Sequence, residues 1–584
     1  MEEKEQIEEL TSNEELKQEE PTVPPTEELA FDYNDPDYKR RKKKASIISV
    51  CVVVTLIVLF AIAMWVWFFI VNYPIITVTH KNIDDLKVSY TLSEDGCYLT
   101  DINYDDYLKE ASTIEIFFSK KIYLSEEGVL ETNTAAQNNA LIQAILDEQE
   151  GKGAVIYVDG KYKVQSLQLK SKTTLVIEED CALIGPTYDD AIDSQAILWA
   201  KDAKSINIYG PGTIVGNGET YTNDAVDSSI FTPLEEFNVY DRVIEARKRL
   251  REAKNKATAA LAGYRPHEIL LNNCSDCKIQ SIRLYESAFW TLCVRDSNDI
   301  TIKDVVIDNN VHVANADGID IVSSQKVSIS HCFISTSDDG ICIKSSGNEN
   351  CDDISIDRCS VMSMANSFKI GTETPNDVKD ISVTNCYFFM PDNVVGGYAG
   401  IAIESADGAN VEDIYVDNIY MNGLSSPLLI WLGDRLDIKK GSDGVTMGSM
   451  SKITVSNITA VNVEMSSAIT GCVHNGETYY VSNVTLANFN VSYRNTGENL
   501  NVKEATYELS KSGYPEITRV LHMWGGSHES SKYFDMPTYG LFARHVYGIE
   551  AYNINITPRS CNTLPRDNIT QAKDRYDVID VKVN

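Results

Sequence analysis

Residues 299–334 read DITIKDVVIDNNVHVANADGIDIVSSQKVSISHCFI, a stretch that begins and ends with the same short motif. Apolar and polar residues alternate within the motif, which is typical of a strand with one buried face. The motif returns as DISIDRCSV at 353 and DISVTNCYF at 380, so its copies start at 299, 326, 353 and 380, a constant step of 27 residues. Strand motifs that recur at a fixed period, with turn residues between them, predict a parallel β-solenoid.

The repeat continues in both directions with less regular spacing. Counted between equivalent apolar residues, the copy at KIQSIRL (Ile279) lies 23 residues before the first (Ile302). Later copies at 416, 455 and 486 follow position 383 at intervals of 33, 39 and 31 residues. A propeller would need ~40–50 residues per blade from the start. We therefore expect an all-β chain that forms a parallel β-helix, with loops that lengthen toward its C-terminal half.

Composition limits the classes of function. The 584 residues are 43% hydrophobic, which suits a large solenoid with a sizeable core. A net charge of −33 argues against a nucleic-acid partner, because phosphates require a basic surface. The thirteen cysteines contain one CxxC pair, at 274 and 277, and no second pair at zinc-site spacing. We expect mainly buried free thiols, with room for one or two disulfides, and neither a metal nor a cofactor; the oligomeric state stays open.

The N-terminal part of the chain predicts a membrane anchor. Residues 1–44 are rich in Glu and end in the basic run KRRKKK, which predicts a disordered acidic tail. Residues 45–71 carry no charge and exceed the ~20 apolar residues that cross a bilayer, whereas the core of a signal peptide spans only ~7–15. Lys and Arg stay on the cytoplasmic side, so we expect a single-pass signal anchor in the cell membrane, a cytoplasmic N-terminus and an extracellular remainder.

Two further segments follow the anchor. Residues 72–126 contain short alternating runs such as KVSYTL and KKIYLS, which predict a small β-rich juxtamembrane module. Residues 127–584 are the predicted β-helix domain. Within it, the segment 131–149 (ETNTAAQNNALIQAILDEQ) has the spacing of a short amphipathic helix, and 234–262 predicts a helical insertion.

A second set of aligned strands places acidic residues together. The segments GIDIVSS (318–324), GICIKSS (340–346), SFKIGTE (367–373) and GIAIESA (400–406) align without gaps. Side-chain alternation turns their Ile and Phe residues inward and predicts two outer columns. One column holds Asp320, Cys342, Lys369 and Ala402, and the next holds Val322, Lys344, Gly371 and Glu404. Just before these strands, Asp317 stacks on Asp339, with Asp338 beside it.

Three acids on neighbouring rungs need an explanation. A single Asp-Gly is accounted for by a turn, but like charges facing one another on adjacent strands are destabilising. Paired carboxylates are what glycoside hydrolysis requires: one acid with a raised pKa protonates the leaving oxygen, and the other activates water or attacks the sugar. Two carboxyl groups on neighbouring strands, displaced along the strands, can be as far apart as those of an inverting or of a retaining glycosidase. The spacing in the sequence therefore does not decide the stereochemistry of cleavage.

Over roughly residues 127–560 the sequence resembles glycoside hydrolase family 28, the polygalacturonase family, in its bacterial branch. The resemblance rests on VDGKYKVQSLQLKSKTTLVIEEDCALIG, IYGPGTIVGNGE, YRPHEILLNNC, NADGID, SDDGICIKS and MPTYGLFARHVYGIEAYNINI. It implies a right-handed parallel β-helix and an O-glycosyl hydrolase that needs no cofactor. The implied substrate is a galacturonic-acid-containing, pectin-type or related polysaccharide, cleaved with inversion.

The resemblance also implies roles for individual residues. The family's Asn-Thr-Asp motif falls on Asn315-Ala316-Asp317, and its Asp-Asp motif falls on Asp338-Asp339. Asp338 is then the general acid, while Asp317 and Asp339 hold and deprotonate the attacking water. The residues expected to bind substrate are Asn315, Asp320, Lys344, Asn366, Lys369, Glu404 and His312.

Two family motifs are altered. The Gly-His-Gly position reads Ala365-Asn366-Ser367, and the Arg-Ile-Lys motif, which grips a galacturonate carboxylate, reads Ala402-Ile403-Glu404. One hypothesis is that Lys369 supplies the lost positive charge. Two other functions compete with hydrolysis: a non-catalytic β-helix that binds carbohydrate or mediates adhesion, and a calcium-dependent lyase. Phe289-Trp290 suits either sugar stacking or core packing.

Overall fold

The computed structural model describes a few isolated residues before position 80 and most of the chain after it. The described residues are 36, 40, 43, 44, 54, 55, 58, 60, 80–93, 98–108, 120–190, 195–221, 265–391, 397–436, 446–463, 466–493, 540–557 and 576–583. From His80 onward they belong to one compact unit.

Three predicted segments fall mostly or wholly outside this description: the tail (1–44), the membrane span (45–71) and the helical insertion (234–262). In the described part of the chain, no helix is both long and apolar enough to cross a membrane.

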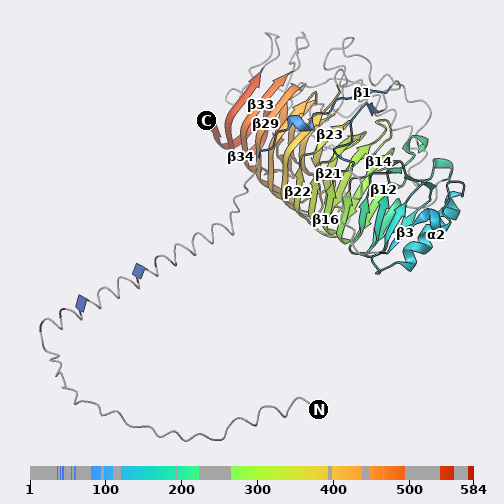
Figure 1. Ribbon diagram of the computed structural model, residues 1–584. Helices are drawn as coiled ribbons and strands as arrows, with labels where there is room; N and C mark the ends of the chain where they lie inside the picture. Colours follow the sequence, from blue (N-terminus) through green and yellow to red (C-terminus); the bar gives the residue numbers. More distant parts are fainter. Residues whose placement is uncertain are drawn as a thin grey trace, which may run out of the picture. The chain divides into compact units, whose positions relative to one another are not determined.

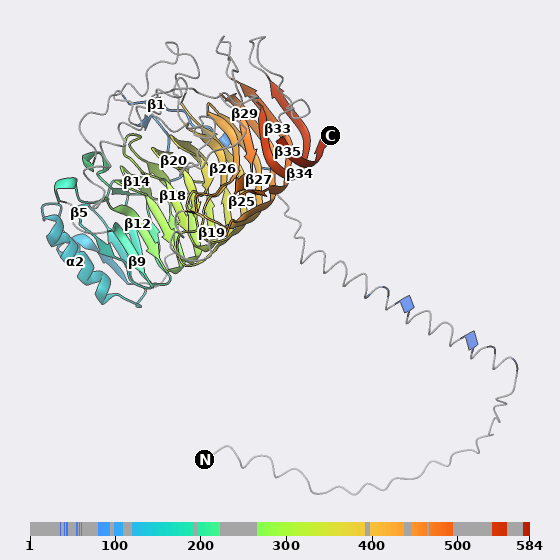
Figure 2. The ribbon, with the colours of Figure 1, turned by 180° about the vertical axis from the view of Figure 1, so that it is seen from behind.

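Parallel strands wind into a solenoid, which confirms the predicted parallel β-helix (Figure 1, and from behind in Figure 2). Each coil contributes strands to three stacks, and every strand of the large sheet pairs in parallel with its equivalent one coil away. The right-handed winding stays a prediction.

The first stack runs along one side of the solenoid. Its strands are β3 (Lys121–Tyr123), β4 (Val155–Val158), β7 (Thr174–Ile177), β10 (Asn207–Tyr209), β13 (Ser275–Gln280), β16 (Asn298–Lys303), β19 (Gln325–Ser330) and β22 (Cys351–Asp357). The second stack consists of β5 (Lys161–Lys163), β8 (Ala182–Ile184), β11 (Thr213–Val215), β14 (Arg283–Tyr285), β17 (Val306–Asp308), β20 (Phe333–Thr336) and β23 (Ser360–Ser363). Toward the C-terminus, long strands continue from the first stack into the second: β25 (Val378–Phe389), β27 (Asn410–Asn422), β29 (Ser449–Val463) and β33 (Val481–Tyr493).

The third stack carries the predicted acidic rungs at the start of its strands. It consists of β6 (Leu167–Gln168), β9 (Ala196–Lys201), β12 (His267–Asn272), β15 (Leu292–Arg295), β18 (Ile319–Val322), β21 (Ile341–Lys344), β24 (Phe368–Ile370), β26 (Ala399–Ser405), β28 (Ser426–Leu432) and β30 (Ser467–Thr470). The last coils are completed by β34 (Leu541–Thr557), which pairs with both β30 and β33, and by β35 (Tyr576–Val583).

The remaining elements are short or lie outside the stacks. They are η1 (Asp84–Leu86), β1 (Thr91–Leu92), β2 (Leu99–Thr100), η3 (Leu124–Glu127), α2 (Ala135–Glu148), η4 (Tyr188–Asp190), η5 (Gly218–Tyr221), β31 (Cys472–His474) and β32 (Glu477–Tyr479).

The 27-residue repeat sets the register of the core. Ile302, Ile329, Ile356 and Val383 pair from coil to coil and are all buried. Each inward position therefore packs against its own equivalents above and below, and one apolar column runs through the solenoid. The ten described cysteines are free thiols, nine of them buried, as expected for most of them.

A single residue in the left-handed conformation turns the chain between the first and second stacks. Asn385, Asn418, Asn457 and Asn488 occupy this position in successive coils, with φ of 54, 55, 52 and 50°. Asn tolerates this region better than most residues because its short polar side chain bonds locally. The Asn457 and Asn488 side chains hydrogen-bond to each other at 2.7 Å, so the bend also forms a ladder.

The predicted helix is confirmed as α2, and it covers the N-terminal end of the solenoid (Figure 1). Thr134 and Gln137 form a capping box at its start. Its Ile142 and Leu146 are buried in the main core, and the Gln143 amide donates to the Gln168 carbonyl at 3.1 Å. The helix therefore shields the first coils from water.

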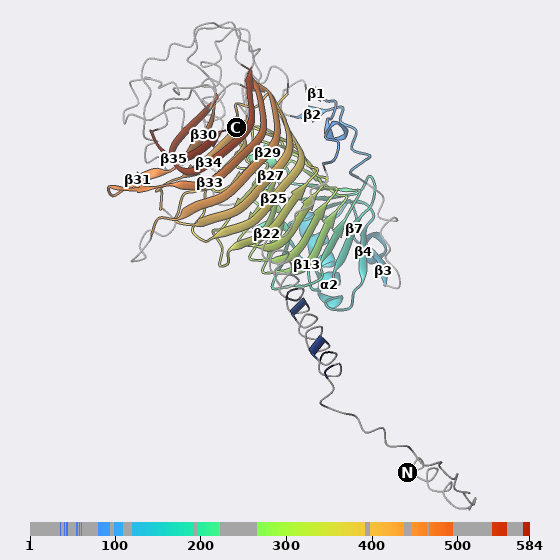
Figure 3. The same cartoon turned by 90° about the vertical axis from the view of Figure 1, so that its left-hand side faces the viewer.

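Residues 80–93 and 98–108, here called the strap, lie along the second stack, and β1 and β2 lie beside the coils (Figure 3). The Tyr107 ring stacks on His331 at 4.7 Å, and the Leu86 carbonyl accepts a hydrogen bond from Ser360 Oγ at 2.7 Å. At its start, His80 Nε2 lies 2.7 Å from Asp417 Oδ2. The sequence placed residues 72–126 in a module of their own; in the structure the strap packs on the solenoid, and β3 within this range is a solenoid strand.

The register of the core predicts that shortening a buried side chain lowers the stability of the solenoid. Replacing Ile329 by Ala should lower the free energy of unfolding by about 2–5 kcal/mol, since the neighbouring coils hold their spacing and leave a void. Thermal unfolding followed by circular dichroism measures the effect, with the exposed Ser328→Ala on the same strand as control. Equal midpoints for the two variants would contradict the assigned inward face.

Candidate active site

The outer wall of the third stack has the predicted register. Asp320 pairs with Cys342, Cys342 with Lys369, and Lys369 with Ala402. Val322 pairs with Lys344 in the adjacent column. The alternation expected from the four aligned segments is therefore confirmed, and polar residues of successive coils lie one strand spacing, ~4.8 Å, apart.

The acids lie on adjacent rungs where the chain enters these strands. Gly318 donates to the Asp339 carbonyl at 2.9 Å, and Gly340 donates to the Asn366 carbonyl at 2.8 Å. Asp317, Asp339 and Asn366 therefore follow one another along the stack, and the Asp338 carboxylate accepts a hydrogen bond from Asp339 N at 3.2 Å.

Close packing of these rungs explains why glycine follows each aspartate. A Cβ on Gly318 would lie 2.4 Å from the Gly340 carbonyl oxygen, and one on Gly340 would lie 2.6 Å from the Ser367 carbonyl oxygen. Any side chain would force the coils apart at the acids. In each Asp-Gly-Ile copy the aspartate supplies a carboxylate, and the glycine lets the neighbouring coils approach closely enough for these aspartates to stack.

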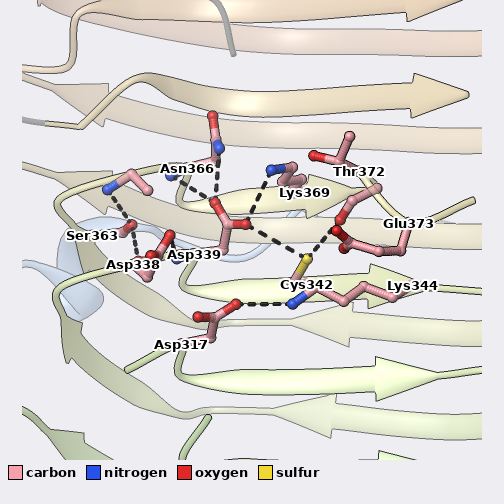
Figure 4. A network of polar contacts seen from close by, with 12 residues as sticks. Asp317, Asp338, Asp339, Cys342, Lys344, Ser363, Asn366, Lys369, Thr372 and Glu373 are labelled. Carbon is pink, nitrogen blue, oxygen red and sulfur yellow. Dashed lines mark hydrogen bonds and ion pairs between the residues drawn. The ribbon is translucent and has the colours of Figure 1, made fainter. Parts of the chain in front are cut away.

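Lys344 lies among the acids rather than in solvent (Figure 4). Its Nζ donates to Asp317 Oδ2 at 2.9 Å and to Asp320 Oδ1 at 2.6 Å, and it lies 3.6 Å from the centre of the Trp290 ring. Burial opposes the charge on Lys344, but Asp317 and Asp320 outweigh it and hold the lysine pKa well above its ordinary value. The two neighbouring carboxyl groups therefore favour the charged form of Lys344 inside the acid cluster.

Lys369 and Asn366 hold Asp339 in the same way (Figure 4). Lys369 Nζ lies 3.1 Å from Asp339 Oδ2, while the Asn366 amide group and backbone N–H donate to Asp339 Oδ1 at 2.8 and 3.2 Å. Burial raises the pKa of Asp339, but Lys369, Lys344 and Asn366 together bring it below its ordinary value. Asp339 is thus kept ionised in a buried position.

The other acids are in different electrostatic states. Burial raises the pKa of Asp317 well above its ordinary value, with Lys344 opposing and the neighbouring acids adding to the rise. Burial likewise raises the pKa of Asp320, to about 6, against the pull of Lys344. Asp317 and Asp339 are 3% and 5% exposed, whereas Asp338 is more accessible. The cluster therefore holds proton donors and acceptors side by side, with Asp338 nearest to solvent.

The other predicted binding residues lie in the loop before Asp317 and on a later strand of the third stack. Asn315 lies in a turn with a left-handed φ of 54°, and its Oδ1 accepts a hydrogen bond from Arg265 at 3.1 Å. His312 is buried in the same loop, where its backbone N–H donates to Asn310. Glu404 is buried on β26 beside Gly371, since a Cβ on that glycine would lie 3.1 Å from Glu404 Oε2.

The structure gives Lys369 a different partner from the one hypothesised. Its ammonium group is ion-paired with Asp339, and its contact with a uronate carboxylate stays a prediction. The alternation of β24 correctly placed Lys369 on the outer wall. It did not indicate where the long side chain ends, because that depends on the neighbouring coil.

Three further residues at the site come from the coils before Asp317. Arg265 donates to the Ala314 carbonyl and to Asn315 Oδ1, and its guanidinium lies 5.0 Å from the centre of the Phe289 ring. Phe289 and Trp290 are stacked parallel at 5.3 Å and are partly exposed. Sequence reasoning left the aromatic pair ambiguous and did not single out Arg265, although it lies in the family-like segment YRPHEILLNNC.

A buried cluster of carboxyl groups on the outer wall of a parallel β-helix is compatible with a carbohydrate-active enzyme of the glycosidase type. The model of the family "Glycosyl hydrolases family 28" matches residues 152–511, which is more than half of the chain. The chain therefore belongs to this family and is a polygalacturonase-like O-glycosyl hydrolase.

Relatives agree with this assignment. An endo-polygalacturonase of Pectobacterium carotovorum is 26% identical over 353 residues, which cover 57% of this chain and 79% of that protein. A probable polygalacturonase of Vitis vinifera is 26% identical over 320 residues, which cover 51% of this chain and 58% of that protein. Since both a bacterium and a plant supply relatives, the bacterial branch stays a prediction.

A solved structure shows the same fold. The family 28 exopolygalacturonase of Yersinia enterocolitica superposes with a TM-score of 0.56 at 16% identity, covering 80% of this chain and 78% of that one.

The Lys369–Asp339 pair predicts a change in pH dependence. Replacing Lys369 by Met should raise the pKa of Asp339, because an opposite charge at this range lowers a carboxyl pKa by about 1–3 units. If Asp339 acts as the base, the acidic limb of the kcat/KM profile moves to higher pH by a similar amount. The control is Lys379→Met, which removes an exposed lysine paired with Asp352. An acidic limb at the wild-type pH in Lys369→Met would show that Lys369 does not tune the base.

Proposed function

We propose that this protein is a membrane-anchored, extracellular glycoside hydrolase that cleaves pectin-type, galacturonic-acid-containing or related polysaccharide with inversion. The observation that supports it most strongly is the set of Asp317, Asp338 and Asp339 on adjacent rungs, with Lys344 and Lys369 bound between them. Family membership and the relatives' activities agree with the substrate class.

In the proposed mechanism, Asp338 donates a proton to the glycosidic oxygen, since it is the most accessible of the three acids. Asp339 is held ionised by Lys369 and Asn366, so it accepts a proton from water. Asp317, fixed by Lys344, helps to orient that water. The water oxygen bonds to the anomeric carbon as the bond to the leaving oxygen breaks, and the product has the opposite anomeric configuration.

The two lysines make this arrangement stable enough to persist. Like charges at one site oppose ionisation and push their pKa values apart. Each buried ammonium group offsets part of this repulsion and binds a carboxylate oxygen of a buried aspartate. A hydrolase needs such a site to hold both protonated and ionised carboxyls at one pH.

The anchor is proposed from the sequence. Residues 45–71 are uninterrupted by charge and follow the basic cluster 39–44, which favours a cytoplasmic N-terminus and an outward-facing solenoid. Polysaccharides of the pectin type are too large to enter a cell, so an outward orientation also suits the proposed substrate.

Removing the proposed general acid should abolish turnover. Asp338→Asn in the full chain should lower kcat on a pectic polymer by about 10²–10⁴-fold, because an amide cannot supply the proton. Reducing-end release measures the rate, and proton NMR of the first product formed by the wild type should show the inverted anomer. The matched control is Asp353→Asn, an exposed aspartate on β22. Wild-type activity in Asp338→Asn, or a retained anomer, would contradict the mechanism.

The topology can be measured on intact cells that express the full chain. A protease added outside should remove an epitope fused after Asn584 and leave one fused before Met1 until the cells are lysed. Protection of the C-terminal epitope would contradict the proposed orientation.

A further inference from the structure

Three buried polar residues follow one another where the strands of the second stack end. Asn309, Thr336 and Ser363 lie 27 residues apart and occupy equivalent positions at the ends of β17, β20 and β23. Each of them is 0% exposed. In the next coil the equivalent position is Met390, which is packed in the apolar core. Polar groups in such places require hydrogen-bond partners, and we call the three residues the second-stack ladder.

Asn309 connects three segments through its side-chain amide. Its Oδ1 accepts a hydrogen bond from the Ser287 backbone N–H at 2.9 Å. Its Nδ2 donates to Thr291 Oγ1 at 2.7 Å and to Thr336 Oγ1 at 3.0 Å. An N–H group can only donate, so the Ser287 contact fixes which end of the amide is the oxygen. Both amide hydrogens are therefore directed at the two threonine hydroxyls.

The two threonines hold the backbone on either side of Asp317. Since the Thr336 hydroxyl accepts from Asn309, its one proton is directed elsewhere, and it donates to the Ala316 carbonyl. The carbonyl of Asp317 itself accepts from the Thr291 backbone N–H at 2.9 Å. The peptide groups before and after Asp317 are therefore both bound by residues that Asn309 contacts.

Ser363 holds the backbone of the other two acids in a similar way (Figure 4). Its Oγ accepts a hydrogen bond from the Ala365 backbone N–H at 3.0 Å, so its proton is directed to the Asp338 carbonyl, at 2.6 Å. That carbonyl belongs to the peptide group between Asp338 and Asp339. The ladder therefore binds backbone groups at each of the three acids.

We propose that the members of the second-stack ladder are positioning residues, which fix the backbone from which the carboxyl groups of Asp317, Asp338 and Asp339 project. This inference rests on the proposed hydrolase function and extends it to residues outside the acid cluster. A misplacement of ~1 Å in a reacting group can lower a rate by about a hundredfold. Loss of a ladder hydroxyl should therefore act on the chemical step, while the surfaces that bind the polysaccharide stay in place.

Two variants of the full-length protein each remove one hydroxyl. Thr336→Val keeps the shape of the side chain but leaves the buried Ala316 carbonyl without its donor, and Ser363→Ala does the same to the Asp338 carbonyl. On the pectic polymer that the wild type cleaves fastest, each variant should lower kcat about 10–100-fold and change KM by less than about twofold. Thr336→Ser restores a hydroxyl and should recover most of the wild-type kcat.

The matched control is Ser335→Ala. Ser335 directly precedes Thr336 on β20 and is equally buried, but its hydroxyl makes no hydrogen bond to any residue that the structure describes. We expect wild-type kcat and KM for this variant. Thermal unfolding midpoints identify any variant that fails to fold, and if Thr336→Val does not fold, Ser363→Ala tests the proposal alone.

Double variants separate positioning from a general loss of stability. Ser363→Ala should lower the residual kcat of Asp338→Asn by a smaller factor than it lowers the wild-type kcat, because residues that act as a unit are not additive. Thr336→Val should behave likewise in combination with Asp317→Asn. A general structural defect would lower kcat by the same factor in either background.

Two results would overturn the inference and leave the hydrolase function standing. One is wild-type kcat in a folded Thr336→Val or Ser363→Ala protein, and the other is a loss of kcat that is undiminished in the double variants. A wild-type protein that cleaves no pectic polymer would instead overturn the proposed function itself.

Discussion

Two buried lysines allow three aspartates to share one place on the solenoid. Parallel stacking brings Asp317 and Asp339 one rung apart, and without compensation that arrangement would be destabilised by repulsion and by loss of hydration. Lys344 and Lys369 each reach a carboxylate at about hydrogen-bond distance, so the stacked acids remain both buried and partly ionised. The catalytic proposal and the predicted pH dependence both follow from these contacts.

Much of the fold could be predicted from periodicity alone. A constant step of 27 residues indicated the length of one coil. Alternation within the aligned segments indicated which residues face outward, because successive side chains of a strand point to opposite faces and the apolar ones face the core. The column of Asp320, Cys342, Lys369 and Ala402 is found as predicted. Backbone register is a local and repeated property, and this makes it readable from the sequence.

The ends of long side chains and the course of irregular segments could not be predicted in this way. Lys344 and Lys369 turn back onto the acids because of charges on neighbouring coils, and nothing in their own strands encodes that choice. Arg265 reaches the site across a loop, through contacts with residues 314 and 315 that are far from it in sequence. The strap shows the same limit, since its tyrosines find partners such as His331 only after the solenoid exists.

A crystal structure of the Asp338→Asn variant with a bound oligosaccharide tests the central claim most directly. We expect the oxygen of one glycosidic linkage to lie within hydrogen-bond distance of the residue 338 side chain, with a water molecule on the opposite face of the sugar in contact with Asp317 and Asp339. An oligosaccharide bound on another face of the solenoid, or one whose linkage contacts only one of the three positions, would contradict the account.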